Sequence, residues 1–221
     1  LFRSEGQVKV DRVGPFELEE CIGSGAMGTV FRARHVTTNQ PVALKIFEGH
    51  NLSRIRSEAA LLAALSHSAI VPYVCHGEEG GRRYLAMDWL QGPTLAQELE
   101  RGALSLAGTL QLGRRLASAL SHAHGRGVVH LDVKPANVLL VAGAAERAVL
   151  VDFGIASSAE HTRNLGGAGT PGYMAPEQTA TGAHVGPQAD VFSLGCVLFE
   201  CLAGSPVWQA DDTLVRHHRA C

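Results

Sequence analysis

The sequence has no excess of charge of either sign. Its 19 Lys and Arg residues stand against 21 Asp and Glu residues, which gives a net charge of −2 over 221 residues. Without a basic excess, nucleic acid is not favoured as the partner. A hydrophobic fraction of 46% with 18% charged residues argues against disorder, because such a chain can bury a sizeable core. The length suits one large domain or two small lobes.

Paired cysteines are also lacking. The five cysteines are odd in number, scattered, and form no CxxC pair. Neither a disulfide framework nor a zinc site is therefore expected, and a reducing compartment is favoured. His217 and His218, like His122 and His124, have no cysteine or carboxylate at ligand spacing. We interpret both histidine pairs as solvated helix positions.

Long apolar runs are absent too. No run reaches the about 18–20 residues that a membrane helix needs, and no signal peptide is visible. The chain begins with Leu rather than Met, so we expect it to be a piece of a longer protein. A membrane anchor of that protein would lie outside this piece, and this piece is expected in the cytoplasm.

The first half of the chain has the pattern of a β-rich lobe. After a lead-in over residues 1–15, short runs rich in β-branched and aromatic residues alternate with turn residues from Phe16 to Phe47, which predicts a meander of strands. Residues 53–65 have apolar residues at helical spacing and predict one helix. Two more strands are predicted over 69–77 and 82–90.

The second half has mainly helical patterns. Ser105 can cap a helix that ends at Gly125 and Gly127. Two short strands are predicted around 137–141 and 148–152. The predicted buried stripe of the helix consists of Leu106, Leu110, Leu116 and Leu120.

Two further segments of the second half stand out. Residues 154–176 are rich in Gly, Ser and Thr and have no periodicity, which predicts a long loop of the kind that is usually functional. Residues 190–203 are apolar almost all round, which predicts a buried central helix.

A glycine-rich segment, GSGAMGTV, runs from Gly23 to Val30. Glycines at the first, third and sixth positions let backbone amides approach phosphate oxygens. The pattern alone is weak, because dinucleotide-binding folds and ordinary turns share it. Here strand-like residues lie on both sides, which favours a β-hairpin over a nucleotide; an ordinary turn is the alternative.

Lys45 ends the apolar run VALK and is followed by Ile46. An ammonium that emerges from a buried strand needs a partner, because an unpaired buried charge is costly. Glu58 on the next predicted helix is the candidate. The alternatives are that Lys45 is a solvated edge residue and that Glu58 pairs with an arginine on its own helix.

The segment HLDVKPANVLL at residues 130–140 places Asp132, Lys134 and Asn137 directly before an apolar run. VDFGIA with Asp152 and GTPGYMAPE ending at Glu177 follow. The order of glycine-rich loop, VALK, helical Glu, HxDxKxxN, DFG and APE resembles the protein-kinase signature set over residues 16–221. GSGAMGTV and GTPGYMAPEQ look most like bacterial-type serine/threonine kinases, and Lys134 and Thr170 resemble the Ser/Thr class rather than the tyrosine class.

The resemblance implies an α+β, bilobal protein-kinase-like fold, with a small β-rich N-lobe containing one main helix and a larger, mainly helical C-lobe. The N-lobe would span 16–90 and the C-lobe 91–221, truncated after the region of the family's helix G. The family expects further helices and an arginine partner for Glu177, so Glu177 would lack that partner and the central helix would expose an apolar face.

The resemblance also implies roles in transfer of the ATP γ-phosphate to Ser or Thr hydroxyls of proteins. Asp132 would act as catalytic base, Lys134 would offset phosphate charge, and Lys45 held by Glu58 would grip the α- and β-phosphates. Asn137 and Asp152 would bind Mg²⁺, with Mn²⁺ as an alternative. The nucleotide-binding residues would be Ile22, Gly23, Ser24, Gly25, Gly28, Val30, Ala43, Lys45, Met87, Asp88, Leu90 and Leu139.

Two more implications concern residues around the loop. His130 would stack with Phe153, Leu62 and Tyr73 as a regulatory spine, which favours packing over direct chemistry for His130. Leu131 stands where kinases switched on by loop phosphorylation carry Arg. We therefore hypothesise that activity does not depend on phosphorylation of the 155–169 loop; the alternative is that Leu131 is a neutral replacement.

Other functions remain open from the sequence. A pseudokinase that binds nucleotide without transfer is the alternative from another class, although Lys45, Glu58, Asp132, Asn137 and Asp152 are all present. A small-molecule kinase is disfavoured by the APE segment. Expected partners are protein substrates, and self-association for autophosphorylation is plausible by resemblance; neither nucleic acid nor membrane contact is expected within this chain.

Overall fold

The computed structural model describes residues 11–25, 28–47, 59–153, 157–158, 169–179 and 183–208. The chain divides into two compact units. One consists of Leu1–Ile55 and Tyr73–Trp89, and the other of Arg56–Pro72 and Leu90–Cys221. Residues 56–72, which the sequence analysis grouped with the first lobe, are therefore part of the second unit.

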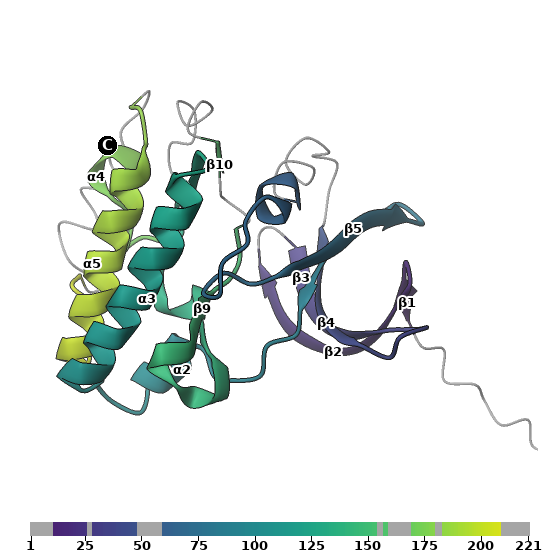
Figure 1. Cartoon of the computed structure of the whole chain (residues 1–221), viewed down its shortest axis with the longest axis horizontal. Coiled ribbons are helices and arrows are strands. Elements are labelled where there is room, and N and C mark those ends of the chain that lie inside the picture. Colours follow the sequence, from purple (N-terminus) through teal and green to yellow (C-terminus); the bar gives the residue numbers. More distant parts are fainter. Residues whose placement is uncertain are drawn as a thin grey trace, which may run out of the picture. The chain divides into compact units, whose positions relative to one another are not determined.

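The first unit is built on a curved, six-stranded sheet (Figure 1). Neighbouring strands are antiparallel throughout. The predicted strands are confirmed, and Arg12–Val13 adds an edge strand within the expected lead-in. In sheet order, the strands are β1 (Arg12–Val13), β2 (Phe16–Gly25), β3 (Gly28–His35), β4 (Pro41–Phe47), β6 (Arg82–Asp88) and β5 (Tyr73–Glu79).

One strand begins later than predicted. β5 starts at Tyr73 rather than at residue 69. The reason is that the backbone before it pairs within the second unit: the N–H of Leu150 donates to the carbonyl of Ala69, and the N–H of Val71 donates to the carbonyl of Leu150. A short apolar run can pair with more than one strand, and the sequence pattern does not choose between them.

The hydrophobic core of the first unit is centred on Phe16 and Tyr84. Two glycines make room for the Tyr84 ring. A Cβ atom on Gly14 or on Gly77 would lie within 2.4 or 2.5 Å of the Tyr84 hydroxyl oxygen. The rest of this buried cluster consists of Val13, Ala33, Val42, Leu44 and Ala86.

The second unit contains two long helices, α3 (Leu106–His124) and α5 (Pro187–Ala203), which pack side by side (Figure 1). Ser105 caps α3 as predicted, since its Oγ accepts the N–H of Gly108 at 3.1 Å. The predicted apolar stripe is wrong at its first turns, because Leu106 and Leu110 are exposed. The buried stripe is instead Thr109, Leu112, Leu116, Ala119, Leu120 and Ala123.

The predicted central helix is confirmed as α5. Pro187 occupies its first turn, and Gly204 ends it with φ 72° in the left-handed region that favours glycine. One face is buried, but the expectation of burial on every side is wrong. Val191, Phe199 and Leu202 are exposed, which agrees with the predicted apolar face.

Short elements complete the second unit. Residues 59–63 form part of the predicted first helix. The strands β8 and β9 form an antiparallel pair, as predicted, and β7 pairs with β10. The bounds are α2 (Leu95–Leu99), β7 (Val128–Val129), η1 (Pro135–Asn137), β8 (Val138–Leu140), η2 (Val141–Gly143), η3 (Ala145–Arg147), β9 (Ala148–Leu150), β10 (Ser157–Ser158) and α4 (Pro176–Thr179).

The cysteines and the membrane-spanning potential, both considered from composition, can be examined in the described residues. Cys21, Cys75, Cys196 and Cys201 are free, and Cys221 lies outside the described residues. Across the described ranges, no helix has the length and apolar character needed to cross a membrane.

Candidate active site

A buried carboxylate fixes the backbone at the start of the HLDVKPAN segment. Asp190, in the first turn of α5, has no exposed surface. Its two oxygens accept the backbone N–H groups of His130 at 2.9 Å and of Leu131 at 2.8 Å. Leu131 has φ 67°, a conformation that side-chain-bearing residues rarely adopt. These bonds hold a strained turn immediately before Asp132.

Asp132 lies at the centre of a compact polar cluster. Its Oδ1 accepts the hydroxyl of Thr170 at 2.7 Å, and its Oδ2 lies 2.8 Å from Nζ of Lys134. The Lys134 ammonium also donates to the Thr170 hydroxyl oxygen at 2.6 Å. The Asn137 side-chain amide donates to Oδ2 and to the backbone oxygen of Asp132, at 3.0 and 2.9 Å. Three polar side chains, those of Thr170, Lys134 and Asn137, are thus brought together around one buried carboxylate.

The β8–β9 hairpin brings Asn137 and Asp152 to the same end of the second unit's small sheet. In its antiparallel register Val138 lies opposite Leu150. Asn137 immediately precedes β8 and Asp152 follows β9 by two residues, and the N–H of Val151 donates to the carbonyl of Asn137 at 2.9 Å. This register explains why polar residues stand directly before an apolar run. Asp152 has φ 60° and is, like Leu131, a non-glycine residue in the left-handed region.

His130 is a packed residue with both ring nitrogens engaged. It is fully buried, and its ring lies edge-on to Phe153 with 4.6 Å between centroids. Its Nδ1 accepts the N–H of Asp132 at 3.2 Å, and its Nε2 lies 3.2 Å from the carbonyl oxygen of Val151. The expected packing against Phe153 is confirmed. Tyr73 lies in the other unit, where its hydroxyl bonds with His76.

The side chain of Leu131 is buried in an apolar pocket. It is 2% exposed and packs in a cluster with Val129, Ala175, Val185 and Ala189. These neighbours belong to β7, to the segment before α4 and to the start of α5. An apolar side chain fits this pocket and ties three elements together.

Residues 169–178 are fixed onto this framework by polar bonds. The buried side chain of Gln178 accepts the N–H of Ala175 at 2.9 Å and donates to the carbonyl of Leu131 at 3.0 Å. The Tyr173 hydroxyl donates to Glu200 of α5 at 2.6 Å, and burial, followed by this contact, raises the pKa of Tyr173 above its ordinary value. The segment that carries Thr170 is therefore docked on α5.

In the first unit, Lys45 is buried in the middle of the sheet. It is 3% exposed, and it lies opposite Val30 on β3 and Leu85 on β6. Its Nζ lies 5.3 Å from the centroid of the Phe47 ring. The expected partner, Glu58, lies outside the described residues, so the pairing stays a prediction.

The glycines of GSGAMGTV differ in what surrounds them. A Cβ atom on Gly28 would lie 2.1 Å from the carbonyl oxygen of Ile46, so β3 can approach β4 only with glycine there. Nothing lies within 4 Å of a Cβ built on Gly23 or Gly25. Gly28 is thus required by the sheet itself, whereas the space at Gly23 and Gly25 is open. Ser24 bonds across the hairpin to Thr29 at 3.1 Å.

The other predicted nucleotide residues belong to both units. Met87 and Asp88 end β6, and Ala43 lies opposite Met87 on β4. Ile22 is 49% exposed on β2. Leu90 begins the second part of the other unit, and Leu139 lies in β8 there.

The predicted loop over 155–169 and Glu177 are described only in part. Most of the 155–169 loop, including Thr162, lies outside the described residues. Ser157 and Ser158 form β10, which pairs with β7. Within the described part of the chain, Glu177 forms no ion pair.

Sequence reasoning missed Asp190 and Gln178 and misjudged His124. His124 is not solvated, because its Nε2 lies 2.7 Å from the buried Oδ2 of Asp190. From the sequence, Thr170 indicated the serine/threonine class of kinases, and its place in the cluster around Asp132 was not predicted. The one signal for Asp190 was a carboxylate in the first turn of an otherwise apolar helix, a position where a buried charge needs partners.

The donor set around Asp132 fits a hard cation. With the Asn137 amide nitrogen directed at Asp132, its Oδ1 receives no hydrogen bond from the described residues. Amide and carboxylate oxygens, such as those of Asn137 and Asp152, are the ligands that Mg²⁺ takes in proteins. In the described ranges, no three His, Cys, Asp or Glu side chains gather as a metal cluster.

Comparisons with known proteins agree with this arrangement. The family model described as protein kinase domain matches residues 16–221. Serine/threonine-protein kinase PknH of Mycobacterium tuberculosis is 38% identical over 217 residues, which cover 93% of this chain and 34% of the relative.

Two other relatives from the same species give a similar result. Serine/threonine-protein kinase PknD is 38% identical over 209 residues, covering 90% of this chain and 31% of the relative. Serine/threonine-protein kinase PknE is 39% identical over 212 residues, covering 91% and 37%. The chain thus spans about a third of the length of the curated relatives it matches.

Proposed function

The chain belongs to the protein kinase family, and on that premise we propose that it transfers the γ-phosphoryl group of ATP to serine or threonine hydroxyls of proteins. The observation that carries the proposal is the cluster of Lys134, Thr170 and Asn137 around the carboxylate of Asp132. Phosphoryl transfer requires positioning and charge neutralisation more than covalent chemistry, and this cluster supplies both.

Asp132 is the residue that we assign to the acceptor hydroxyl. Both of its carboxylate oxygens accept hydrogen bonds, from Thr170 on one side and from Lys134 and Asn137 on the other. These donors hold the carboxylate in a fixed orientation, in which we assign it to orient the acceptor hydroxyl and take its proton. Such assistance contributes about 10²–10⁴-fold in rate.

Lys134 and Lys45 are assigned to phosphate charge. Lys134 is partly exposed beside Asp132, where an ammonium can offset negative charge on the group being transferred. Lys45 is buried in the sheet of the other unit, and we assign it, with Glu58, to the α- and β-phosphates. The open space at Gly23 and Gly25 suits backbone contact with phosphate oxygens.

The family generally uses ATP with Mg²⁺, and we assign Asn137 and Asp152 as the protein ligands. When bound, the ion would neutralise charge on the phosphates. The chain's own contribution is to hold the two side chains at one end of the β8–β9 hairpin, with Asn137 oriented by its bonds to Asp132.

The adenine ring is assigned to the first unit's sheet and to the segment that follows β6. Val30 and Ala43 lie on one face of the sheet, because Val30 stands opposite Lys45, and Lys45 and Ala43 are two residues apart on β4. The contributing residues in this proposal are Ile22, Val30, Ala43, Met87, Asp88, Leu90 and Leu139.

Protein substrates, self-association for autophosphorylation and a cytoplasmic location complete the proposal. A reaction that consumes ATP needs the cytoplasmic nucleotide pool, and the names of the relatives point to proteins as acceptors. The bond of Tyr173 to α5 and that of Gln178 to Leu131 hold residues 170–178 in place, with Thr170 beside Asp132.

The test is radiolabelled phosphotransfer from ATP with Mg²⁺ to a generic basic protein and to the chain itself. We expect label on serine and threonine that disappears in Asp132→Asn. Nucleotide binding without transfer, in this chain and in a C-terminally longer one, would instead identify a pseudokinase.

A further inference from the structure

Arg32 lies on the face of the sheet that the proposed function assigns to adenine. In the register of the sheet, Arg32 stands opposite Ala43, and Ala43 stands opposite Met87. Directly opposite residues of antiparallel strands share a face, and so do residues two apart on one strand. Arg32 therefore shares its face with Val30, Ala43 and Met87.

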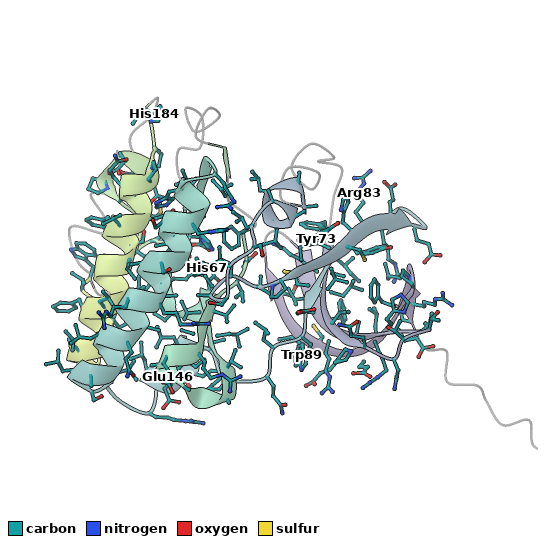
Figure 2. All side chains as sticks on the ribbon, viewed as in Figure 1. His67, Tyr73, Arg83, Trp89, Glu146 and His184 are labelled. Carbon is teal, nitrogen blue, oxygen red and sulfur yellow. The ribbon has the colours of Figure 1, made fainter. Side chains whose placement is uncertain are left out.

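The guanidinium of Arg32 lies over the ring of Trp89. Its Cζ is 5.3 Å from the ring centroid, within the range of a cation–π contact. Trp89, labelled in Figure 2, directly follows the last residue of β6. It is the middle residue of the Asp88–Leu90 segment to which the proposed function assigns part of the adenine site.

The guanidinium of Arg32 also has a charge contact with Glu19, but this contact lacks the geometry of a hydrogen bond. Nε of Arg32 lies 3.0 Å from Oε2 of Glu19, yet this buried atom has no partner with hydrogen-bond geometry among the described residues. Arg34, two residues along β3, makes aligned bonds: its Nε donates to Oε1 of Glu19 at 2.7 Å, and its Nη1 donates to the carbonyl of Asn39 at 3.0 Å. Glu19 is thus satisfied by Arg34, while Arg32 keeps only a charge contact.

We propose that Arg32 is a positioning residue for nucleotide binding. By stacking on Trp89 it ties β3, the strand that leaves the glycine-rich hairpin, to the segment that follows β6. The inference rests on the proposed function, because it assumes that this segment holds the adenine. Loss of the contact would free the Trp89 segment to move relative to β3, and nucleotide would bind less tightly while the transfer chemistry in the other unit stays intact.

The chain offers a matched control for this proposal. Arg32 and Arg34 lie on the same strand, carry the same charge and contact the same carboxylate, at similar side-chain exposures of 38% and 33%. Among the described residues, only Arg32 also contacts a ring. If the two arginines served only to neutralise Glu19, substituting either would have the same small effect, as is usual for exposed ion pairs.

The experiment compares Arg32→Gln with Arg34→Gln in the whole chain. ATP affinity is measured by calorimetry with Mg²⁺, and Trp89 emission is measured in a Trp208→Phe background, where Trp89 is the remaining tryptophan. We expect Arg32→Gln to raise the Kd for ATP about two- to fivefold, as the loss of an exposed cation–π contact implies. It should also shift Trp89 emission without ATP and leave kcat at saturating ATP unchanged. Arg34→Gln should change neither reading.

A second variant, Arg32→Lys, controls for misfolding. Arg32→Lys keeps the charge near Glu19 but loses the planar stack, so it should weaken ATP binding in the same direction as Arg32→Gln. Equal Kd values in the unsubstituted chain and in the Arg32 variants, or equal changes at Arg32 and Arg34, would overturn the inference alone. Absence of ATP binding by the unsubstituted chain would overturn the proposed function together with it.

Discussion

The partly buried His124 pairs with the fully buried Asp190, with 2.7 Å between Nε2 of the imidazole and Oδ2 of the carboxylate. Asp190 accepts two backbone N–H groups as well, from His130 and Leu131. The same carboxylate therefore connects α3, α5 and the segment that carries Asp132. The left-handed backbone of Leu131 persists because these bonds determine it.

Asp190→Asn should therefore destabilise the protein and reduce phosphotransfer. The amide keeps the size of the side chain but removes the charge, and its NH₂ group would face donors. We expect a loss of about 1.5–3 kcal/mol in the free energy of unfolding, the contribution of buried bonds to a charged group. Urea unfolding measures this loss. His124→Gln, which removes one partner and leaves the two backbone bonds, should cost less; an equal cost would contradict the ranking.

Thr170→Ala should slow phosphotransfer by about 10- to 100-fold. The hydroxyl of Thr170 bridges Oδ1 of Asp132 and Nζ of Lys134, so its loss removes charge-assisted bonds from both. Initial rates at saturating ATP report the effect. Thr170→Ser keeps the hydroxyl and is the control. If the serine variant were as slow as the alanine variant, the bridge would not be the reason for the loss.

The chemistry of the site could be predicted from the sequence because its central residues are close in the chain. Asp132, Lys134 and Asn137 lie within six positions, and the β8–β9 pairing that brings Asp152 to them follows from two short apolar runs. Asp190 could not be found in this way. Asp190 lies about 60 positions further along the chain, and only the tertiary fold brings it within hydrogen-bond distance of the Leu131 N–H.

The helix α3 illustrates a second limit. Leucines at helical spacing predicted a buried face, but the face that packs is rotated from the predicted one and leaves Leu106 and Leu110 exposed. Periodicity indicates that a helix has an apolar face, while the neighbouring elements decide which residues are covered. The position of His124 on the buried side of the same helix follows from this rotation.

Stability should fall in mild acid because of His67, labelled in Figure 2. Its Nδ1 accepts the N–H of Ala69 at 3.1 Å, so protonation there breaks a backbone bond. Burial first, then the nearby His122 and Arg115, lower the pKa of His67 below its ordinary 6.5. The unfolded chain therefore takes up this proton at higher pH than the folded chain. The contribution of neutral His67 to the free energy of unfolding is complete above pH 6.5 and is lost as pH falls through the pKa of the folded state.

Urea midpoints from pH 8 to pH 5 test this assignment. The decrease toward pH 5 should be smaller in His67→Asn than in the unsubstituted chain. His184, which is exposed, provides the matched control, and His184→Asn should retain the full decrease. A decrease of the same size in His67→Asn would assign the acid sensitivity to other groups.

Phosphotransfer should persist when Ser157, Ser158 and Thr162 are all replaced by Ala. A phosphorylated loop activates through a cationic partner, and a charge-assisted bond of that kind contributes about 1.5–3 kcal/mol. Leu131 cannot supply it, because its side chain is apolar and lies buried among Val129, Ala175, Val185 and Ala189. The rate of the triple variant toward a basic protein, with Asp132→Asn as the background, should stay close to that of the unsubstituted chain. A fall to the background would mean that another cation pairs with the loop and that Leu131 serves only to pack this turn.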